Sequence, residues 1–230
     1  MTATKSWRIS AENTPDLMTK FGTLGISVPD RTQPKDQFAE EIYCLRRYLF
    51  PLANADLLDF PLGVVKQDHP DFMFAWRDGR NTGLEVTKAT RQEFEADLTR
   101  FHRQQQTKSY VSDLATGTML LSELGWAGNA PETEWVTYVL AAIADKLNDI
   151  ASYSVLESDL LIYDNTPLPA PDLKIVAEAI RLHFVRQPLA DKDGCSFRMI
   201  SVIRDPCLIY DIARVPRILR YDPAWDQQPA

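Results

Sequence analysis

Apolar side chains recur at helical spacing in several stretches of the chain, where they mark the buried face of each element. The spacing and the flanking residues predict helices at about residues 34–50, 91–106, 134–150 and 172–184. The first helix carries four apolar residues within roughly 60° of arc, which are Phe38, Ile42, Leu45 and Leu49. Pro34 suits its first turn, Thr90 and Glu93 fit a capping box for the second helix, and Asp172 caps the fourth.

Shorter apolar runs between these helices, bounded by turn residues, predict strands. Residues 71–77 and 84–88 flank the turn-rich sequence 78–83 and predict a β-hairpin. Further strands are predicted at about residues 63–65, 158–163, 197–203 and 208–212. Residues 1–30 and 221–230 have no clear periodicity, so we expect them to be partly ordered.

The order of these elements predicts an α/β fold. Strands that alternate with helices favour a mixed sheet that helices cover on both faces. No internal repeat and no linker divides the chain, and its 230 residues suit one large domain. We therefore expect a single domain over residues 1–230, with its structured core at about residues 34–212.

Composition places the chain among ordinary globular proteins, with 45% hydrophobic and 25% charged residues. A formal net charge of −7 argues against a generally basic surface for nucleic acid, although a local basic groove is compatible with it. No apolar run approaches the roughly 18 residues of a membrane helix, and the N-terminus has no apolar signal region. The three cysteines form no CxxC pair, so they support neither a disulfide framework nor a zinc ribbon and favour a reducing, cytoplasmic location.

The predicted hairpin holds the most informative polar residues. Side chains alternate faces along a strand, so Glu85 and Thr87 share one face while Val86 and Lys88 share the other. Asp71 begins the partner strand, where its carboxylate can meet that of Glu85. Oxygen ligands of this kind suit Mg²⁺ or Mn²⁺, and the backbone carbonyl of Val86 can add one more. The alternative is structural: Asp71 caps a strand, and Glu85 is an exposed residue of the sheet.

The sequence Pro70-Asp71, followed after the turn by Glu85-Val86-Thr87, resembles the signature of the PD-(D/E)XK nuclease superfamily. The order of elements over about residues 34–165 is also similar to the core of that family. The resemblance implies a restriction-endonuclease-like fold, in which helices flank a mixed β-sheet. It also implies a metal-dependent endonuclease that uses Mg²⁺ or Mn²⁺ and hydrolyses nucleic acid, with DNA as the expected partner, in defence against foreign DNA or in DNA repair. A homodimer is compatible with this reading.

Two predicted helices supply the other candidates. Lys146 falls within the apolar stripe of helix 134–150, which consists of Trp135, Val139, Ala142, Ile143 and Ile150. A lysine on a core face needs an acidic partner, unless it snorkels to solvent at the helix end. Some members of the resembled family carry their catalytic lysine on this helix. Glu41 lies about 70° from the centre of the first helix's apolar stripe. The resembled family often has a carboxylate on that helix that completes the metal site; the alternative is a solvated flank.

Thr87 stands where the resembled family has its catalytic lysine. Threonine carries no positive charge, and Lys88 lies on the opposite face of a regular strand, from which only a β-bulge would bring it to the site. We therefore expect Asp71 and Glu85 to bind the metal, and Lys146 to supply the cation. The alternative is a catalytically inactive module with a nuclease fold that serves interaction or regulation.

Overall fold

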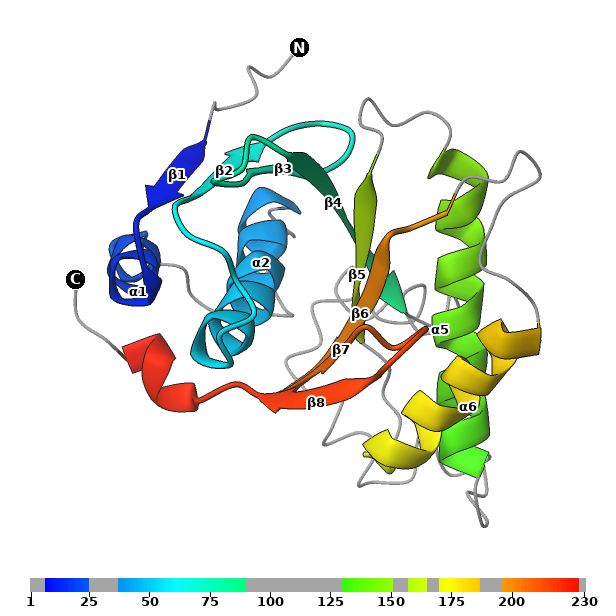
Figure 1. The fold of residues 1–230 in the computed structure, drawn as a ribbon. Helices are drawn as coiled ribbons and strands as arrows, with labels where there is room; N and C mark the ends of the chain where they lie inside the picture. Colours follow the sequence, from blue (N-terminus) through cyan, green and yellow to red (C-terminus); the bar gives the residue numbers. More distant parts are fainter. Residues whose placement is uncertain are drawn as a thin grey trace, which may run out of the picture.

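The computed structural model describes residues 7–24, 37–89, 130–150, 157–164, 170–186 and 196–227. These residues form one mixed eight-stranded sheet with helices on both faces (Figure 1). The strands are β1 (Arg8–Ala11), β2 (Leu62–Lys66), β3 (Phe72–Ala75), β4 (Asn81–Ala89), β5 (Ser158–Asp164), β6 (Met199–Arg204), β7 (Cys207–Tyr210) and β8 (Arg217–Arg220). The helices are α1 (Thr14–Gly22), α2 (Gln37–Asn54), α5 (Ala130–Asp149), α6 (Leu173–Arg186) and the short 3-10 helix η2 (Pro223–Gln227). The predicted α/β class is confirmed.

The strands lie in the sheet in the order of the sequence, from β1 to β8. The first four strands are antiparallel to their neighbours, and β2, β3 and β4 form a meander. Strands β4, β5 and β6 run parallel, and β6, β7 and β8 are again antiparallel. Parallel neighbours need a long crossover connection, and the connections after β4 and β5 contain α5 and α6. The centre of the sheet is therefore its parallel part.

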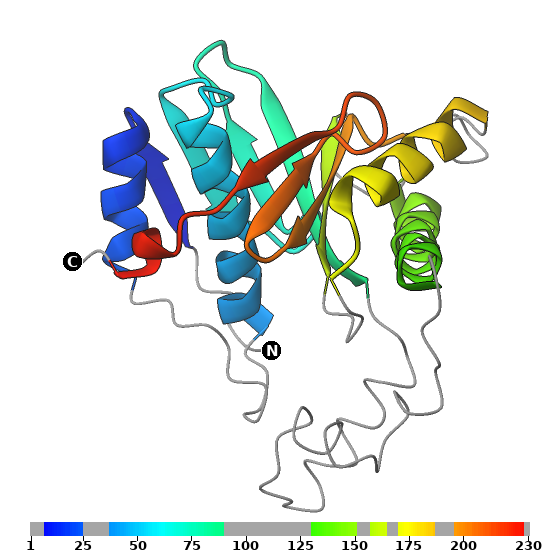
Figure 2. The ribbon, with the colours of Figure 1, turned by 90° about the horizontal axis from the view of Figure 1, so that it is seen from below.

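The sheet curves around α2, whereas α5 and α6 cover its outer face (Figures 1 and 2). Each face has its own hydrophobic core. Leu161 of β5 belongs to the core on the α2 side, and its neighbours Leu160 and Ile162 belong to the core on the α5 side. Strand β5 thus buries side chains on both faces, as expected of a central parallel strand. None of the helices in the described parts of the chain has the length and apolar character needed to cross a membrane.

Helix α2 is buried more completely than one apolar stripe predicts. Its residues from Glu41 to Ala53 are all buried, because the curved sheet contacts the helix on several sides. The helix also continues through Pro51 to Asn54, four residues beyond the predicted end at residue 50. A proline removes one helical hydrogen bond, and here the burial of Leu52 and Ala53 offsets that loss.

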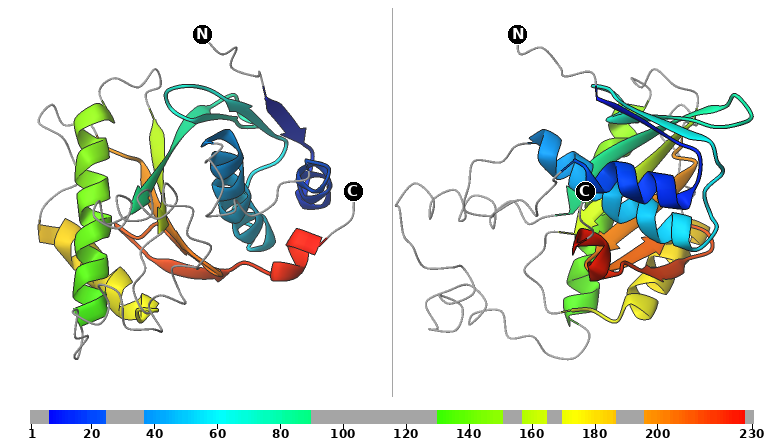
Figure 3. Two further views of the ribbon diagram at one scale, coloured as in Figure 1. Left: turned by 180° about the vertical axis from the view of Figure 1, so that it is seen from behind. Right: turned by 90° about the vertical axis from the view of Figure 1, so that its left-hand side faces the viewer.

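Both ends of the described chain hold regular elements for which the sequence pattern predicted none. Near the N-terminus, β1 pairs with β2, and the Asn13 side chain caps α1 by accepting from the backbone N–H of Asp16. Near the C-terminus, Trp225 of η2 packs against Phe50 of α2, with ring centroids 5.8 Å apart, and α1 lies on the same side (Figure 3). These elements are too short for a clear periodicity, and tertiary contacts stabilise them. The helix predicted at residues 91–106 lies outside the described residues.

Candidate functional site

The sheet has an opening beside β4, on the edge that faces β3, beyond Leu84. Strand β3 pairs with β4 only as far as Leu84, whereas β4 continues to Ala89 in register with β5. The backbone N–H of Val86 donates to Oδ2 of Asp71 at 2.8 Å, so the Asp71 side chain occupies the place that a longer β3 would fill. The structural role predicted for Asp71, capping a strand, is therefore present. It also brings the Asp71 carboxylate to the opening in the sheet.

Asp71 lies next to a second acid and a lysine at this opening. Lys66, the last residue of β2, places Nζ 2.9 Å from Oε2 of Glu41 and 3.3 Å from Oδ1 of Asp71. The amide of Gln37 donates to Oε1 of Glu41 at 2.8 Å. Glu41 is thus held in a buried cluster and is not a solvated flank.

Burial and mutual repulsion raise the pKa values of two of these acids. Burial raises the pKa of Glu41, and the negative charge of Asp71 raises it further. Burial also raises the pKa of Asp71, with the charge of Glu85 as the next cause. Asp71 is therefore close enough to Glu41 to affect its ionisation, and Glu85 is close enough to affect that of Asp71.

Glu85 approaches the opening from the α5 side of the sheet and is only 3% exposed. Nζ of Lys146 on α5 lies 2.6 Å from its Oε1. Its second oxygen, Oε2, is buried and has no hydrogen-bond partner among the residues that the structure describes. A buried polar atom without a partner is costly, so this oxygen is a candidate ligand atom for a cation. The exposed-residue alternative for Glu85 is wrong, and Lys146 faces the sheet, as its position in the apolar stripe predicts.

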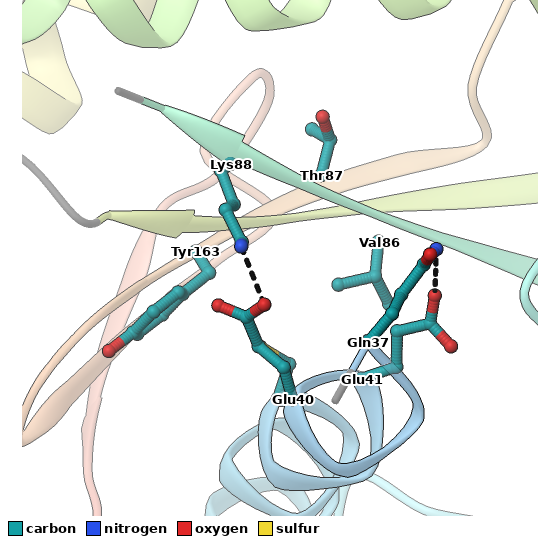
Figure 4. Close-up of a pocket in the computed structure, with 8 residues that line it drawn as sticks. Gln37, Glu40, Glu41, Val86, Thr87, Lys88 and Tyr163 are labelled. Atoms are coloured by element: carbon teal, nitrogen blue, oxygen red, sulfur yellow. Dashed lines mark hydrogen bonds and ion pairs between the residues drawn. The ribbon is translucent and has the colours of Figure 1, made fainter. Parts of the chain in front are cut away.

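Lys88 and Thr87 lie on opposite faces of β4. The β4–β5 register runs without interruption from Gly83 to Ala89, so no β-bulge against β5 shifts these residues. Lys88 reaches the α2 side, where its Nζ lies 2.5 Å from Oε2 of Glu40, and Thr87 projects from the other side (Figure 4). The Lys88 ammonium is therefore engaged with Glu40 and does not join Lys146 at Glu85.

Lys66 is the residue of this cluster that sequence reasoning missed. The strand predicted at 63–65 stops one residue before it. In β2, Leu62 and Val64 are buried and Val65 is exposed, so alternation puts Lys66 on the buried face. A prediction extended by one residue would have found a lysine on an inward face, the same signal that identified Lys146.

Two other buried carboxylates have structural partners. Asp159 of β5 accepts two bonds from the Arg198 guanidinium, at 2.6 and 3.0 Å, and burial raises its pKa to about 6. Asp164, at the end of β5, accepts from Nε1 of Trp135 and from Nη1 of Arg204, both at 2.6 Å. These contacts hold β5 to α5 and to residues 198–204 at β6, so neither acid belongs to the cluster at the opening.

The side chains at the opening can supply a metal ion with only one or two carboxylate ligands. Among the residues that the structure describes, no three His, Cys, Asp or Glu side chains are grouped so as to hold a metal. Lys66 and Lys146 already contact the three carboxylates, which leaves the cluster a formal charge of only −1. Mg²⁺, however, commonly uses only one or two carboxylates and keeps several waters. Asp71 and the unpartnered Oε2 of Glu85 meet that requirement.

A comparison of the chain with protein-family models, with curated proteins and with solved structures found no match.

Proposed function

We propose that the chain is a metal-dependent nuclease of the PD-(D/E)XK type. The observation that carries the proposal is the buried, unpartnered Oε2 of Glu85, beside the Lys146 ammonium and close to Asp71. An acid that lacks a hydrogen bond inside a protein is costly unless another cation or proton reaches it. A divalent cation at this oxygen would remove that cost and would place catalytic charge at the opening of the sheet.

The restriction-endonuclease-like fold is part of the same proposal. Helix α2, the meander from β2 to β4, helix α5 and the parallel strand β5 follow one another in the order that the resembled family has. The three carboxylates come from α2, from the start of β3 and from β4, the positions that the resemblance implies. This agreement in where the carboxylates lie on the elements supports the proposal.

Asp71, Glu85 and the Val86 carbonyl would hold the ion. The N–H and C=O of a strand residue leave the backbone on the same side, so the Val86 carbonyl shares the open edge with the Asp71 carboxylate that its N–H contacts. Glu41 would stay behind them, bound to Lys66. When bound, the ion supplies Lewis-acid polarisation of the phosphate and assistance in ionising water.

Lys146 would supply the positive charge that Thr87 lacks. In phosphodiester hydrolysis, water forms a new P–O bond, the bond to the sugar oxygen breaks, and that oxygen takes up a proton. Negative charge therefore grows on the phosphate oxygens as the reaction proceeds. The Lys146 ammonium, fixed by Glu85, would lie ready for that charge without having to reorganise.

The test is cleavage of plasmid and of single-stranded DNA with Mg²⁺ or Mn²⁺. Glu85→Gln should abolish cleavage. Lys146→Met keeps much of the apolar stem and should lower the rate by about 10²–10³-fold, the usual effect of one preorganised electrostatic donor. Lys88→Met is the matched control and should cost far less. A larger loss of rate in Lys88→Met than in Lys146→Met would assign the catalytic cation to β4. Equal cleavage rates for the wild type and all variants would mean that these residues take no part in the reaction.

A catalytically inactive module is the second candidate, and Lys66 is the observation that favours it. Its ammonium already lies between Glu41 and Asp71, so two of the acids share one positive charge without a metal. Absence of cleavage with any nucleic acid and either metal would support this reading. DNA as partner, a role in defence or repair, homodimerisation and a cytoplasmic location stay predictions.

A further inference from the structure

A pocket of about 330 Å³ adjoins the carboxylate cluster, between the first turns of α2 and the end of β4 (Figure 4). Gln37, Glu40 and Glu41 line it from α2, Val86 and Lys88 line it from β4, and Tyr163 lines it from β5. Its volume lies in the range of small-ligand sites. Glu41 belongs both to this wall and to the cluster with Lys66 and Asp71, so a group in the pocket would lie beside the proposed metal site.

The electrostatics of the wall do not suit a phosphate. Glu40 has Lys88 as its partner, and Glu41 has Lys66. Lys88 thus offsets the charge of Glu40, and Glu41 shares Lys66 with Asp71, so no excess positive charge remains among them to hold an anion. A neutral ligand with several hydrogen-bonding groups fits this wall better.

The side chains of the wall suit a flat heterocycle with hydrogen-bonding groups. Tyr163 offers an aromatic ring, and Val86 adds an apolar contact next to it. A carboxylate has about four lone-pair sites, so Glu40 keeps acceptor capacity while Lys88 occupies one. Aromatic side chains stack on unpaired bases, and a carboxylate accepts from the exocyclic amino group of cytosine.

We propose that this pocket binds one unpaired nucleobase of the substrate, an inference that rests on the proposed nuclease function. A base inside a duplex cannot enter such a pocket unless it leaves the stack. The substrate would therefore be a nucleic acid strand that is single-stranded at the site. Tyr163 would stack on the base, and Glu40 would favour bases with an amino group over thymine.

The experiment is fluorescence anisotropy of labelled 12-mers with the full chain in Ca²⁺, conditions chosen to permit binding without cleavage. We expect single-stranded oligo-dC to bind more tightly than oligo-dT and than a duplex of the same length. Tyr163→Leu should weaken the binding of oligo-dC roughly 5- to 150-fold, the range that stacking of one base supplies. Tyr163→Phe keeps the ring and should keep most of the affinity. Tyr138→Leu, the same change on α5 across the sheet, is the control.

The outcomes separate this inference from the nuclease proposal. Equal affinity for duplex and single strand, or a Tyr163→Leu variant as tight as Tyr138→Leu, would overturn the base pocket and leave cleavage to be judged by its own test. Single-strand binding that depends on Tyr163, together with no cleavage by the wild type in Mg²⁺ or Mn²⁺, would support the pocket and overturn the nuclease. Failure to bind any oligonucleotide would overturn the base pocket.

Discussion

The ammonium group of Lys66 lies 2.9 Å from Oε2 of Glu41, and the two side chains are only 10% and 9% exposed. The same Nζ lies 3.3 Å from Oδ1 of Asp71. One lysine thus compensates two buried acids that come from different elements. Because an uncompensated buried charge is costly, the structure depends on this lysine in the absence of another cation.

Lys66→Met should therefore lower the stability of the metal-free protein but increase its stabilisation by Mn²⁺. Without metal, the variant should lose about 3–5 kcal/mol of unfolding free energy, the usual cost of removing one partner of a buried ion pair. With Mn²⁺, its gain in melting temperature should exceed that of the wild type, because the metal no longer competes with an ammonium group. Thermal denaturation with and without Mn²⁺ measures both effects.

Lys174→Met, at an exposed position of α6, is the control for the Lys66 variant and should change neither quantity appreciably. A Lys66→Met variant that is as stable as the wild type would mean that the two acids take up protons at no cost. A smaller response to Mn²⁺ would mean that Lys66 helps to form the metal site.

Metal binding should also depend on pH through the acids at the opening. Burial and neighbouring charge raise the pKa values of Asp71 and Glu41. The folded protein therefore holds these protons more firmly than the unfolded chain does, and stability without metal falls as the pH rises through the raised values. A metal must displace the protons, so the gain in melting temperature with Mn²⁺ should grow as the pH rises through the raised values, which a series of melting curves from acid to neutral pH measures.

The size of this gain follows from mass action. A metal at 100 times its Kd stabilises the fold by about 2.7 kcal/mol, and the double variant Asp71→Asn with Glu85→Gln should lose that gain. The double variant Asp78→Asn with Glu178→Gln changes one exposed aspartate and one exposed glutamate, and it should keep the gain. If the Asp71–Glu85 variant responds to Mn²⁺ like the wild type, the ion binds elsewhere.

Asp164 offers a test of the fold that is independent of function. Its side chain accepts from Trp135 on α5 and from Arg204 on β6. Asp164→Ala removes this acceptor and should cost about 3–5 kcal/mol in urea denaturation. Asp164→Asn keeps one carbonyl oxygen and should cost less. Glu178→Ala, which breaks an exposed pair with Arg181, should cost far less than Asp164→Ala. A loss as small at Asp164 as at Glu178 would contradict a structural role for the buried pair.

Regular periodicity explains which parts of the cluster the sequence could predict. The contact between Glu85 and Lys146 follows from strand alternation at one residue and helical angle at the other, because each pattern identifies a face turned toward the other element. Thr87 and Lys88 fall on opposite faces for the same reason.

Features that depend on where strands end could not be read in this way. The bond from the Val86 N–H to Asp71 exists because β3 stops where β4 continues, and no local pattern marks that difference in length. Strand β1 and helix α1 are stabilised by contacts with distant residues, so their short sequences carry little signal of their own. Tyr163 and Glu40 line the same pocket only because β5 lies next to β4.

The position of Lys146 in the chain has a consequence for synthesis. Glu41, Lys66, Asp71 and Glu85 all belong to the segment 37–89, which emerges from the ribosome well before α5. Pairing of β4 with β5 joins residues as distant as Gly83 and Ser158, and such non-local contacts form slowly. A nascent chain therefore carries the acids and Lys66 before it has the lysine that meets Glu85, so this residue is the last member of the cluster to be made.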